Sequence, residues 1–114
     1  MIKIYHNPRC SKSREALNII NEHNAKVEIV EYLNEQPSEQ ELIEVLKKLG
    51  MNASEIIRKG EPVYQDKFKG KSLSDDEWIQ AMIQFPKLIE RPIVIKGDKA
   101  VLGRPPENVL ELLK

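Results

Sequence analysis

The chain changes from a strand pattern to a helix pattern within residues 5–14, which read Tyr5-His6-Asn7-Pro8-Arg9-Cys10-Ser11-Lys12-Ser13-Arg14. Apolar and polar side chains alternate along residues 1–5, as they do in a strand, and apolar side chains recur at helical spacing along residues 15–23. Asn7-Pro8 between the two runs is a turn signal. The only cysteine of the chain, Cys10, therefore lies where a strand ends and a helix begins.

A cysteine at the start of a helix is well placed to be reactive. The first N–H groups of a helix have no intrahelical acceptor and the helix dipole is positive at this end, so both features stabilise a thiolate. Arg9, Lys12 and Arg14 add positive charge close to Cys10. A lone cysteine is most often a small buried hydrophobe, but these polar neighbours favour a reactive thiol.

The same stretch holds further groups that suit an anion. The backbone N–H groups from Ser11 to Arg14, with the hydroxyls of Ser11 and Ser13, predict an anion-binding nest. The sequence leaves two readings of His6 open: a proton donor or cation beside Cys10, or a residue that forms a hydrogen bond within the loop.

The rest of the chain predicts an α/β fold in one domain, residues 1–114. A second strand at residues 27–30 completes a βαβ unit with a parallel pair. Helices follow at residues 38–50, 53–59 and 74–85, with residues 61–73 as a loop, and capping pairs mark the first and third helix (Ser38 with Glu41, Ser74 with Glu77). Residues 92–96 and 99–102 flank a Gly97-Asp98 hairpin turn, and a last helix starts at the Pro105-Pro106 pair. The order βαβ … ββα predicts a thioredoxin-like mixed sheet with a helical insertion at about residues 38–86.

Composition excludes several classes of function. Lysine plus arginine and aspartate plus glutamate both number 18, so the net charge is zero, which argues against nonspecific nucleic-acid binding. No apolar run reaches the length of a membrane span, and one cysteine with two distant histidines does not make a metal site. A single cysteine and no signal-peptide pattern predict a reducing, cytoplasmic setting.

The arginines are few and unevenly placed. Two of the five flank Cys10 (Arg9 and Arg14), two precede prolines (Arg91-Pro92 and Arg104-Pro105), and Arg58 ends the short helix predicted at residues 53–59. Guanidinium groups bind oxyanions and carboxylates through two parallel donors. Arg91 and Arg104 flank the two ends of the predicted hairpin, so they can converge on an anion. The alternative for each arginine is a surface ion pair or a helix cap.

Three motifs resemble those of the glutaredoxin-linked arsenate reductases, particularly their shorter members. These motifs are His6-Asn7-Pro8-x-Cys10-Ser11-x-Ser13-Arg14, Leu88-Ile89-x-Arg91-Pro92-Ile93-Val94 and Gly103-Arg104-Pro105-Pro106-Glu107. They occur in family order across nearly the whole chain. The resemblance implies a thioredoxin-like fold with a helical insertion, in agreement with the layout above.

The resemblance also implies roles for individual residues. Cys10 matches the nucleophile that attacks arsenate, and His6 matches a histidine that helps to lower the pKa of this cysteine. Arg58, Arg91 and Arg104 match the oxyanion-binding arginines. Arg91-Pro92 matches the position at which thioredoxin-like folds have a cis proline.

The implied reaction is covalent catalysis without a tightly bound cofactor. Cys10 forms a thiol–arsenate adduct, glutathione acts as co-substrate, arsenite is released, and glutaredoxin restores the Cys10 thiol from a mixed disulfide. The single cysteine independently requires that the second thiol comes from another molecule.

Two other functions remain open at this stage. The Spx-type regulators, which bind RNA polymerase, share the fold and a similar Arg-Pro-Ile segment, but their Cys-x-x-Cys switch reads Cys10-Ser11-Lys12-Ser13 here. A general glutathione-dependent thiol–disulfide oxidoreductase would need Cys10 but not three oxyanion-binding arginines.

Overall fold

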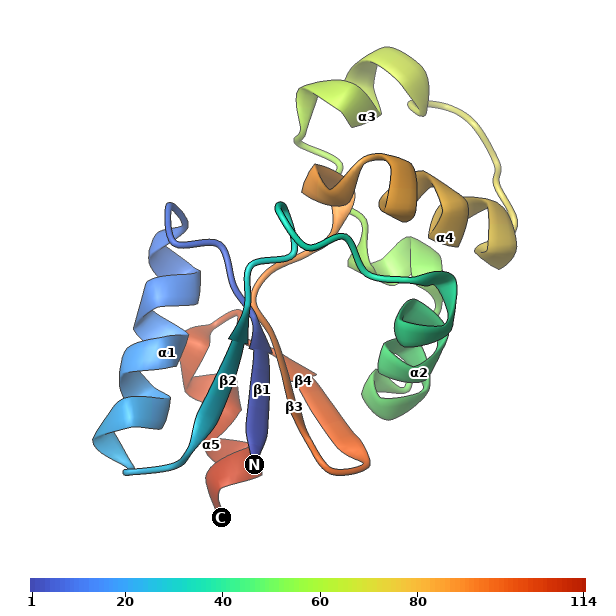
Figure 1. Ribbon diagram of the computed structural model, residues 1–114. Coiled ribbons are helices and arrows are strands. Elements are labelled where there is room, and N and C mark those ends of the chain that lie inside the picture. The colour runs from blue at the N-terminus through green and yellow to red at the C-terminus, as the bar shows by residue number, and fades with distance from the viewer. The chain divides into compact units, whose positions relative to one another are not determined.

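Strand β1 (Ile2–Tyr5) lies inside a four-stranded mixed sheet in the computed structural model, which describes residues 1–114 (Figure 1). The strand order is β2-β1-β3-β4. β1 pairs in parallel with β2 (Val27–Val30) and antiparallel with β3 (Ile93–Lys96), and β3 pairs antiparallel with β4 (Lys99–Leu102). The predicted βαβ … ββα order and mixed sheet are thus confirmed.

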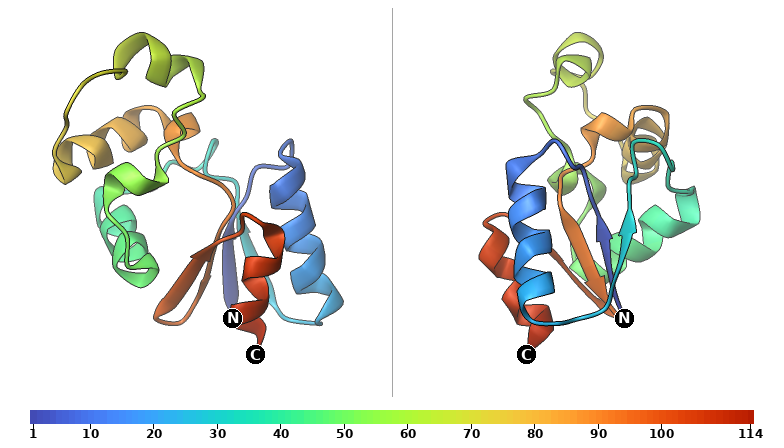
Figure 2. Two further views of the ribbon diagram at one scale, coloured as in Figure 1. Left: turned by 180° about the vertical axis from the view of Figure 1, so that it is seen from behind. Right: turned by 60° about the vertical axis from the view of Figure 1, so that its left-hand side comes forward.

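One face of this sheet packs against helices from both ends of the chain. The core cluster joins side chains of β1, β3, α1 (Ser11–Glu22), the 3-10 turn η3 (Pro106–Val109) and α5 (Leu110–Leu113), namely Ile2, Ile4, Ala16, Ile20, Val94, Val109 and Leu112. Figure 2 shows α1 and α5 beside each other along the sheet. This packing fixes the start of α1, and with it Cys10, at the end of β1.

The hairpin between β3 and β4 turns at Gly97-Asp98, as the sequence predicts. Gly97 has a φ of 62°, a left-handed conformation that glycine adopts without steric cost. The peptide bonds Arg91–Pro92 and Arg104–Pro105, just outside the two ends of the hairpin, are both cis. The first of these two cis bonds was expected from the family resemblance.

Residues 36–90 form a second compact unit, separate from the unit made by residues 1–35 and 91–114. It contains α2 (Glu39–Leu49), the 3-10 turn η1 (Ala53–Ile56), α3 (Pro62–Lys67), α4 (Asp75–Gln84) and the 3-10 turn η2 (Pro86–Leu88). Helix α4 packs against α2 and both 3-10 turns. The division of the chain into domains, including an insertion at about 38–86, stays a prediction.

The caps predicted for two helices of this unit are present. Ser38 accepts from the backbone N–H of Glu41 at the start of α2. Ser74 and Glu77 form a complete capping box at the start of α4, with each side chain accepting from the other residue's backbone N–H. Both helices therefore begin where their sequence signals place them.

Three predicted boundaries are wrong. Helix α1 starts at Ser11 rather than Glu15, because its first turn is polar and lacks the apolar periodicity used to find it. The short helix ends at Ile56, so Arg58 lies beyond it in an extended segment that bridges to Ile89 through Ile57. Residues 62–67, predicted as loop, form α3.

Helix α3 could not be predicted from apolar periodicity, because none of its residues is buried. It begins with Pro62 at its first position, which suits a helix start. Tyr64 anchors it by stacking on Trp78 of α4 at a ring-centroid distance of 6.2 Å. Phe68, the C-cap residue of α3, packs against the same ring at 5.6 Å in a tilted arrangement. No helix of the protein has the length and apolar character needed to cross a membrane.

Candidate active site

Cys10 is the N-cap residue of α1, directly after the loop that leaves β1. Its backbone is fixed on both sides: its N–H donates to the carbonyl of Asn7 at 3.0 Å, and its own carbonyl accepts from Arg14 N–H at 3.0 Å. The residue is only 8% exposed. The thiol therefore stays in one place, and the N–H of Ser13 in the first helical turn donates to it.

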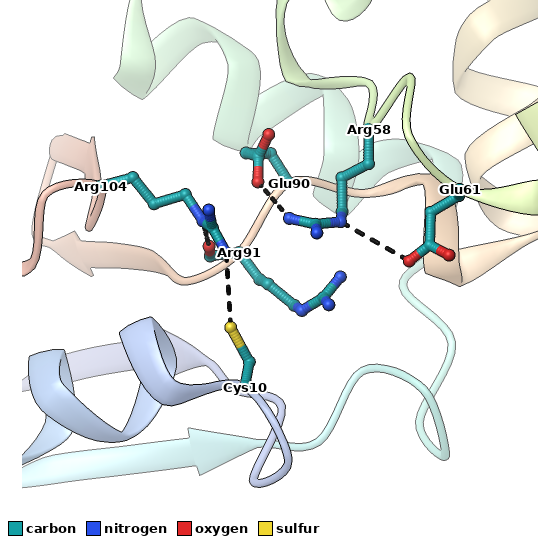
Figure 3. A network of polar contacts seen from close by, with 6 residues as sticks. All are labelled: Cys10, Arg58, Glu61, Glu90, Arg91 and Arg104. Carbon is teal, nitrogen blue, oxygen red and sulfur yellow. Dashed lines mark hydrogen bonds and ion pairs between the residues drawn. The ribbon is translucent and has the colours of Figure 1, made fainter.

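Two arginines from the far end of the chain meet at this thiol (Figure 3). Arg104 Nη2 donates to Cys10 Sγ at 3.5 Å, and Arg104 Nε donates to the backbone carbonyl of Arg91 at 2.7 Å. The Arg91 side chain also hydrogen-bonds to the thiol. The structure thus brings together two arginines that flank the hairpin and are 13 residues apart in the chain.

These contacts lower the pKa of the Cys10 thiol below its ordinary value. Burial is the largest single effect and raises the pKa, because it disfavours the charged thiolate. The Ser13 N–H, the hydrogen bonds from Arg104 and Arg91, and the positive charge of Arg91 lower it, and together they outweigh burial. The site therefore favours a thiolate in a largely desolvated position, which is the ionised form needed for nucleophilic attack.

His6 is buried and contacts Ser13. Its Nδ1 lies 2.6 Å from Ser13 Oγ, which also accepts from the N–H of Asn7 at 3.1 Å. Burial lowers the pKa of His6, the charge of Arg14 lowers it further, and Glu31 only partly offsets them. Of the two readings that the sequence left open, this geometry favours a hydrogen-bonding role, with a neutral imidazole that reaches the thiol only through Ser13.

The side chains of Ser11, Lys12 and Arg14 form no hydrogen bond with the thiol. Arg14 Nη1 donates to the carbonyl of Pro8 at 2.9 Å and so holds the loop before Cys10. Ser11 is exposed at the first position of α1, and Lys12 pairs with Glu15 at 3.7 Å. Within this stretch, the Ser13 N–H donates to the thiol, and the wider anion nest stays a prediction.

Arg58 belongs to the unit of residues 36–90, where two carboxylates hold its guanidinium group. Its Nη1 lies 2.6 Å from Glu90 Oε1, and its Nε lies 3.6 Å from Glu61 Oε1 (Figure 3). Neither glutamate was predicted to belong to the site. One sequence signal could have indicated Glu90, because it directly precedes the Arg91-Pro92 motif.

No group of three or more histidine, cysteine, aspartate or glutamate side chains is arranged to hold a metal ion. The side chains that meet at Cys10 supply a thiol and two guanidinium groups. A nucleophile with cationic hydrogen-bond donors fits a covalent reaction on an oxyanion or on a disulfide.

Comparisons with known proteins place the chain in a family. The model of the ArsC family matches residues 5–112. The chain is 50% identical to the uncharacterized protein YfgD of Escherichia coli, over 98% of this chain and 96% of that protein, and 45% identical to an arsenate reductase of Haemophilus influenzae, over 96% and 97%. The solved structure of an arsenate reductase from Vibrio cholerae superimposes with a TM-score of 0.92 at 45% identity, covering 96% of this chain and 95% of that one.

The fold and a cysteine at the start of the first helix define a thioredoxin-like protein. The family model and the relatives match nearly the whole length of the chain, which identifies the family as well as the fold. The chain belongs to the ArsC family.

Proposed function

We propose that this protein reduces arsenate to arsenite, with Cys10 as the nucleophile and glutathione and glutaredoxin as its thiol partners. The observation that carries the proposal is the Cys10 thiol at the N-cap of α1, whose pKa is lowered by the Ser13 N–H, Arg104 and Arg91. Arsenate reductases among the relatives, at 45% identity in Haemophilus influenzae and 40% in Neisseria meningitidis, support arsenate as the substrate.

The reaction begins with attack of the Cys10 thiolate on arsenic(V). A sulfur–arsenic bond forms, and one arsenate oxygen leaves as water after taking up protons. Arg91 and Arg104 already donate hydrogen bonds to the sulfur and can balance the charge of an oxyanion bound beside it. Arg58 serves as the third oxyanion-binding arginine in this proposal, on the strength of the family resemblance.

Reduction follows when glutathione attacks the Cys10 sulfur of the adduct. The sulfur–arsenic bond breaks, its electron pair stays on arsenic, and arsenic(III) leaves as arsenite. Cys10 is then joined to glutathione in a mixed disulfide. A glutaredoxin thiolate attacks the glutathione sulfur and releases the Cys10 thiolate, and a second glutathione regenerates glutaredoxin. Arsenate and two glutathione molecules thus give arsenite, glutathione disulfide and water, in the reducing cytoplasm that the single cysteine predicts.

The test is arsenate-dependent oxidation of NADPH, coupled through glutathione reductase, with glutathione and glutaredoxin present. Wild-type protein should turn over arsenate and Cys10→Ser should not. A folded wild-type protein that gives no turnover with several glutaredoxins would rule out arsenate as the substrate. General thiol–disulfide exchange would then become the leading function.

A further inference from the structure

The side chain of Asn108 holds the loop that carries Arg104. Its Nδ2 amino group donates to the carbonyl of Leu102 at 3.1 Å and to the carbonyl of Arg104 at 3.2 Å. Both partners are acceptors, so only the amino end of the amide can occupy this position. Asn108 is half-buried in η3, whereas Arg104 is exposed. One side chain therefore fastens the main chain on both sides of Gly103.

Main-chain hydrogen bonds add to the fastening of this loop. The N–H of Asn108 donates to the carbonyl of Pro105 at 3.0 Å, and the N–H of Gly103 donates to the carbonyl of Pro92 at 2.8 Å. Pro105 has no N–H of its own, so the loop cannot continue the ladder of β4 through this residue. Asn108 thus supplies the donors for three carbonyls of the loop. Together these bonds fix the point from which the Arg104 side chain starts.

A fixed starting point matters for Arg104 because its guanidinium group contacts a residue 94 positions away in the chain. Arg104 Nη2 donates to Cys10 Sγ at 3.5 Å, and Nε donates to the carbonyl of Arg91 at 2.7 Å (Figure 3). A long side chain with many rotamers keeps such a contact only when its main chain is held in place. All of these residues belong to the unit of residues 1–35 and 91–114, so the contacts lie within one compact body.

We propose that Asn108 is a positioning residue for the candidate active site: its side-chain amino group fastens the loop around Arg104 and so keeps the Arg104 guanidinium group on the Cys10 sulfur. Asn108 itself forms no hydrogen bond with the sulfur and acts through Arg104. The inference deepens the proposed function and rests on its choice of Cys10 as the nucleophile, but it makes no assumption about the substrate.

Removing the donors of Asn108 should therefore change the ionisation of Cys10. Asn108→Leu keeps the size of the side chain, adds no charge and removes both side-chain N–H groups. The Arg104 guanidinium group should then lie on the sulfur for less of the time, and the thiolate should lose part of a charge-assisted hydrogen bond. The pH midpoint of Cys10 ionisation should move upward, as it should in Arg104→Ala, and by no more than in that variant.

The experiment measures the rate at which iodoacetamide alkylates Cys10 across pH, on the full chain and without arsenate or glutathione. At a pH below the midpoint, Arg104→Ala should lower the rate by about tenfold, the size of one charge-assisted hydrogen bond, and Asn108→Leu by about threefold. Asn108→Leu added to Arg104→Ala should give no further change, because Asn108 acts through Arg104. Asn21→Leu, at an exposed asparagine of α1, is the matched control and should behave as wild type.

Two results would overturn the inference: a midpoint of Asn108→Leu equal to that of the wild type, or a further upward shift when Asn108→Leu is added to Arg104→Ala. The second result is the one expected of a merely structural role. Circular dichroism and urea unfolding show which variants fold. If Asn108→Leu does not fold, Asn108→Ala removes the same donors and decides the question, and a failure of both to fold would assign Asn108 to the fold as a whole and overturn the inference.

The readout also separates this inference from the proposed function. Because no arsenate is present, a wild-type protein that does not turn over arsenate would overturn the proposed substrate alone. A wild-type midpoint no lower than that of a free cysteine would overturn the proposed nucleophile and this inference together.

Discussion

Cys10 combines two properties that normally oppose each other, burial and a lowered pKa. Burial alone would keep the thiol protonated, and the Ser13 N–H, Arg104 and Arg91 reverse this outcome. Nothing in this balance requires His6, which bonds to Ser13 instead. The two arginines therefore lower the pKa of the thiol in the free protein, before any anion is bound.

We expect Arg91→Ala and Arg104→Ala to raise the pKa of Cys10 toward its ordinary value. Each change removes a hydrogen bond to the thiol while burial, which raises the pKa, remains. The alkylation rate of Cys10 measured across pH should therefore rise at a higher pH in both variants. Arg9→Ala, an exposed arginine with no side-chain contact, is the control.

The same Arg91→Ala variant separates the proposed enzyme from a general thiol–disulfide oxidoreductase. Loss of a donor to a developing oxyanion costs about 10²-fold in turnover, so arsenate reduction should fall by roughly that factor. Reduction of a glutathione mixed disulfide should fall much less, since it involves no oxyanion. Equal losses in both assays would contradict the oxyanion role of Arg91.

His6 should make the protein less stable in acid. Its pKa is lowered by burial, so the folded protein resists protonating a group that the unfolded chain protonates readily. The stabilisation is complete above the ordinary pKa of histidine and is lost as the pH falls through the lowered value. His6→Gln should therefore show a smaller drop in the free energy of unfolding between pH 7 and pH 5, measured with urea. His23→Gln, on the exposed end of α1, serves as the comparison.

At the scale of elements, Gly103 joins β4 to Arg104 and lies against the proline of the cis Arg91–Pro92 bond. A Cβ at this position would lie 2.6 Å from Pro92 Cγ and 3.4 Å from the Cβ of Ala16. Gly103→Ala should destabilise the protein by about 1–3 kcal/mol through overpacking. Urea unfolding checks this, with Gly60→Ala as the control, because a Cβ there meets nothing within 4 Å. Equal stability of both variants would disprove the packing argument.

Helix α3 depends on aromatic packing, and the single tryptophan reports on it. Phe68→Ala removes the ring that packs 5.6 Å from Trp78. The change should shift Trp78 emission to the red and cost about 2 kcal/mol, less than a fully buried phenylalanine because Phe68 is half-buried. Phe68→Leu, which keeps an apolar side chain, should shift the emission less. Unchanged emission in Phe68→Ala would mean that α3 is held by other contacts.

These elements show what local sequence can and cannot predict. The starts of α2 and α4 were predictable because Ser38 and Ser74 cap them and apolar side chains follow at helical spacing. Cys10 was predictable because a strand and a helix meet there. Helix α3 was not predictable, because aromatic contacts with α4, a helix further along the chain, hold it in place.

Contacts between residues far apart in the sequence could not be predicted from local patterns either. The pairing of Arg58 with Glu90 spans 32 residues and depends on the backbone bridge between Ile57 and Ile89. The bond from Arg104 to the carbonyl of Arg91 depends on the hairpin that separates them. Residue spacing indicated that Arg91 and Arg104 could converge, but the partners of each guanidinium follow from tertiary structure.

For the whole molecule, the decisive fact is that 114 residues contain one thiol. A protein with a second cysteine can close an internal disulfide and release its product without help. In the proposed reaction, Cys10 has no thiol partner within the chain once arsenite has left, so it stays bonded to glutathione. The protein should therefore stop after one turnover when glutaredoxin is omitted.

This single turnover can be observed directly. Wild-type protein mixed with arsenate and glutathione should release about one arsenite per chain, in a rapid burst, and intact mass spectrometry should find one glutathione on Cys10. Adding glutaredoxin should remove the glutathione and restore steady turnover. Cys10→Ser should give neither burst nor adduct. Steady turnover with glutathione alone would mean that glutathione itself can reduce the mixed disulfide, and glutaredoxin would no longer be needed as a partner.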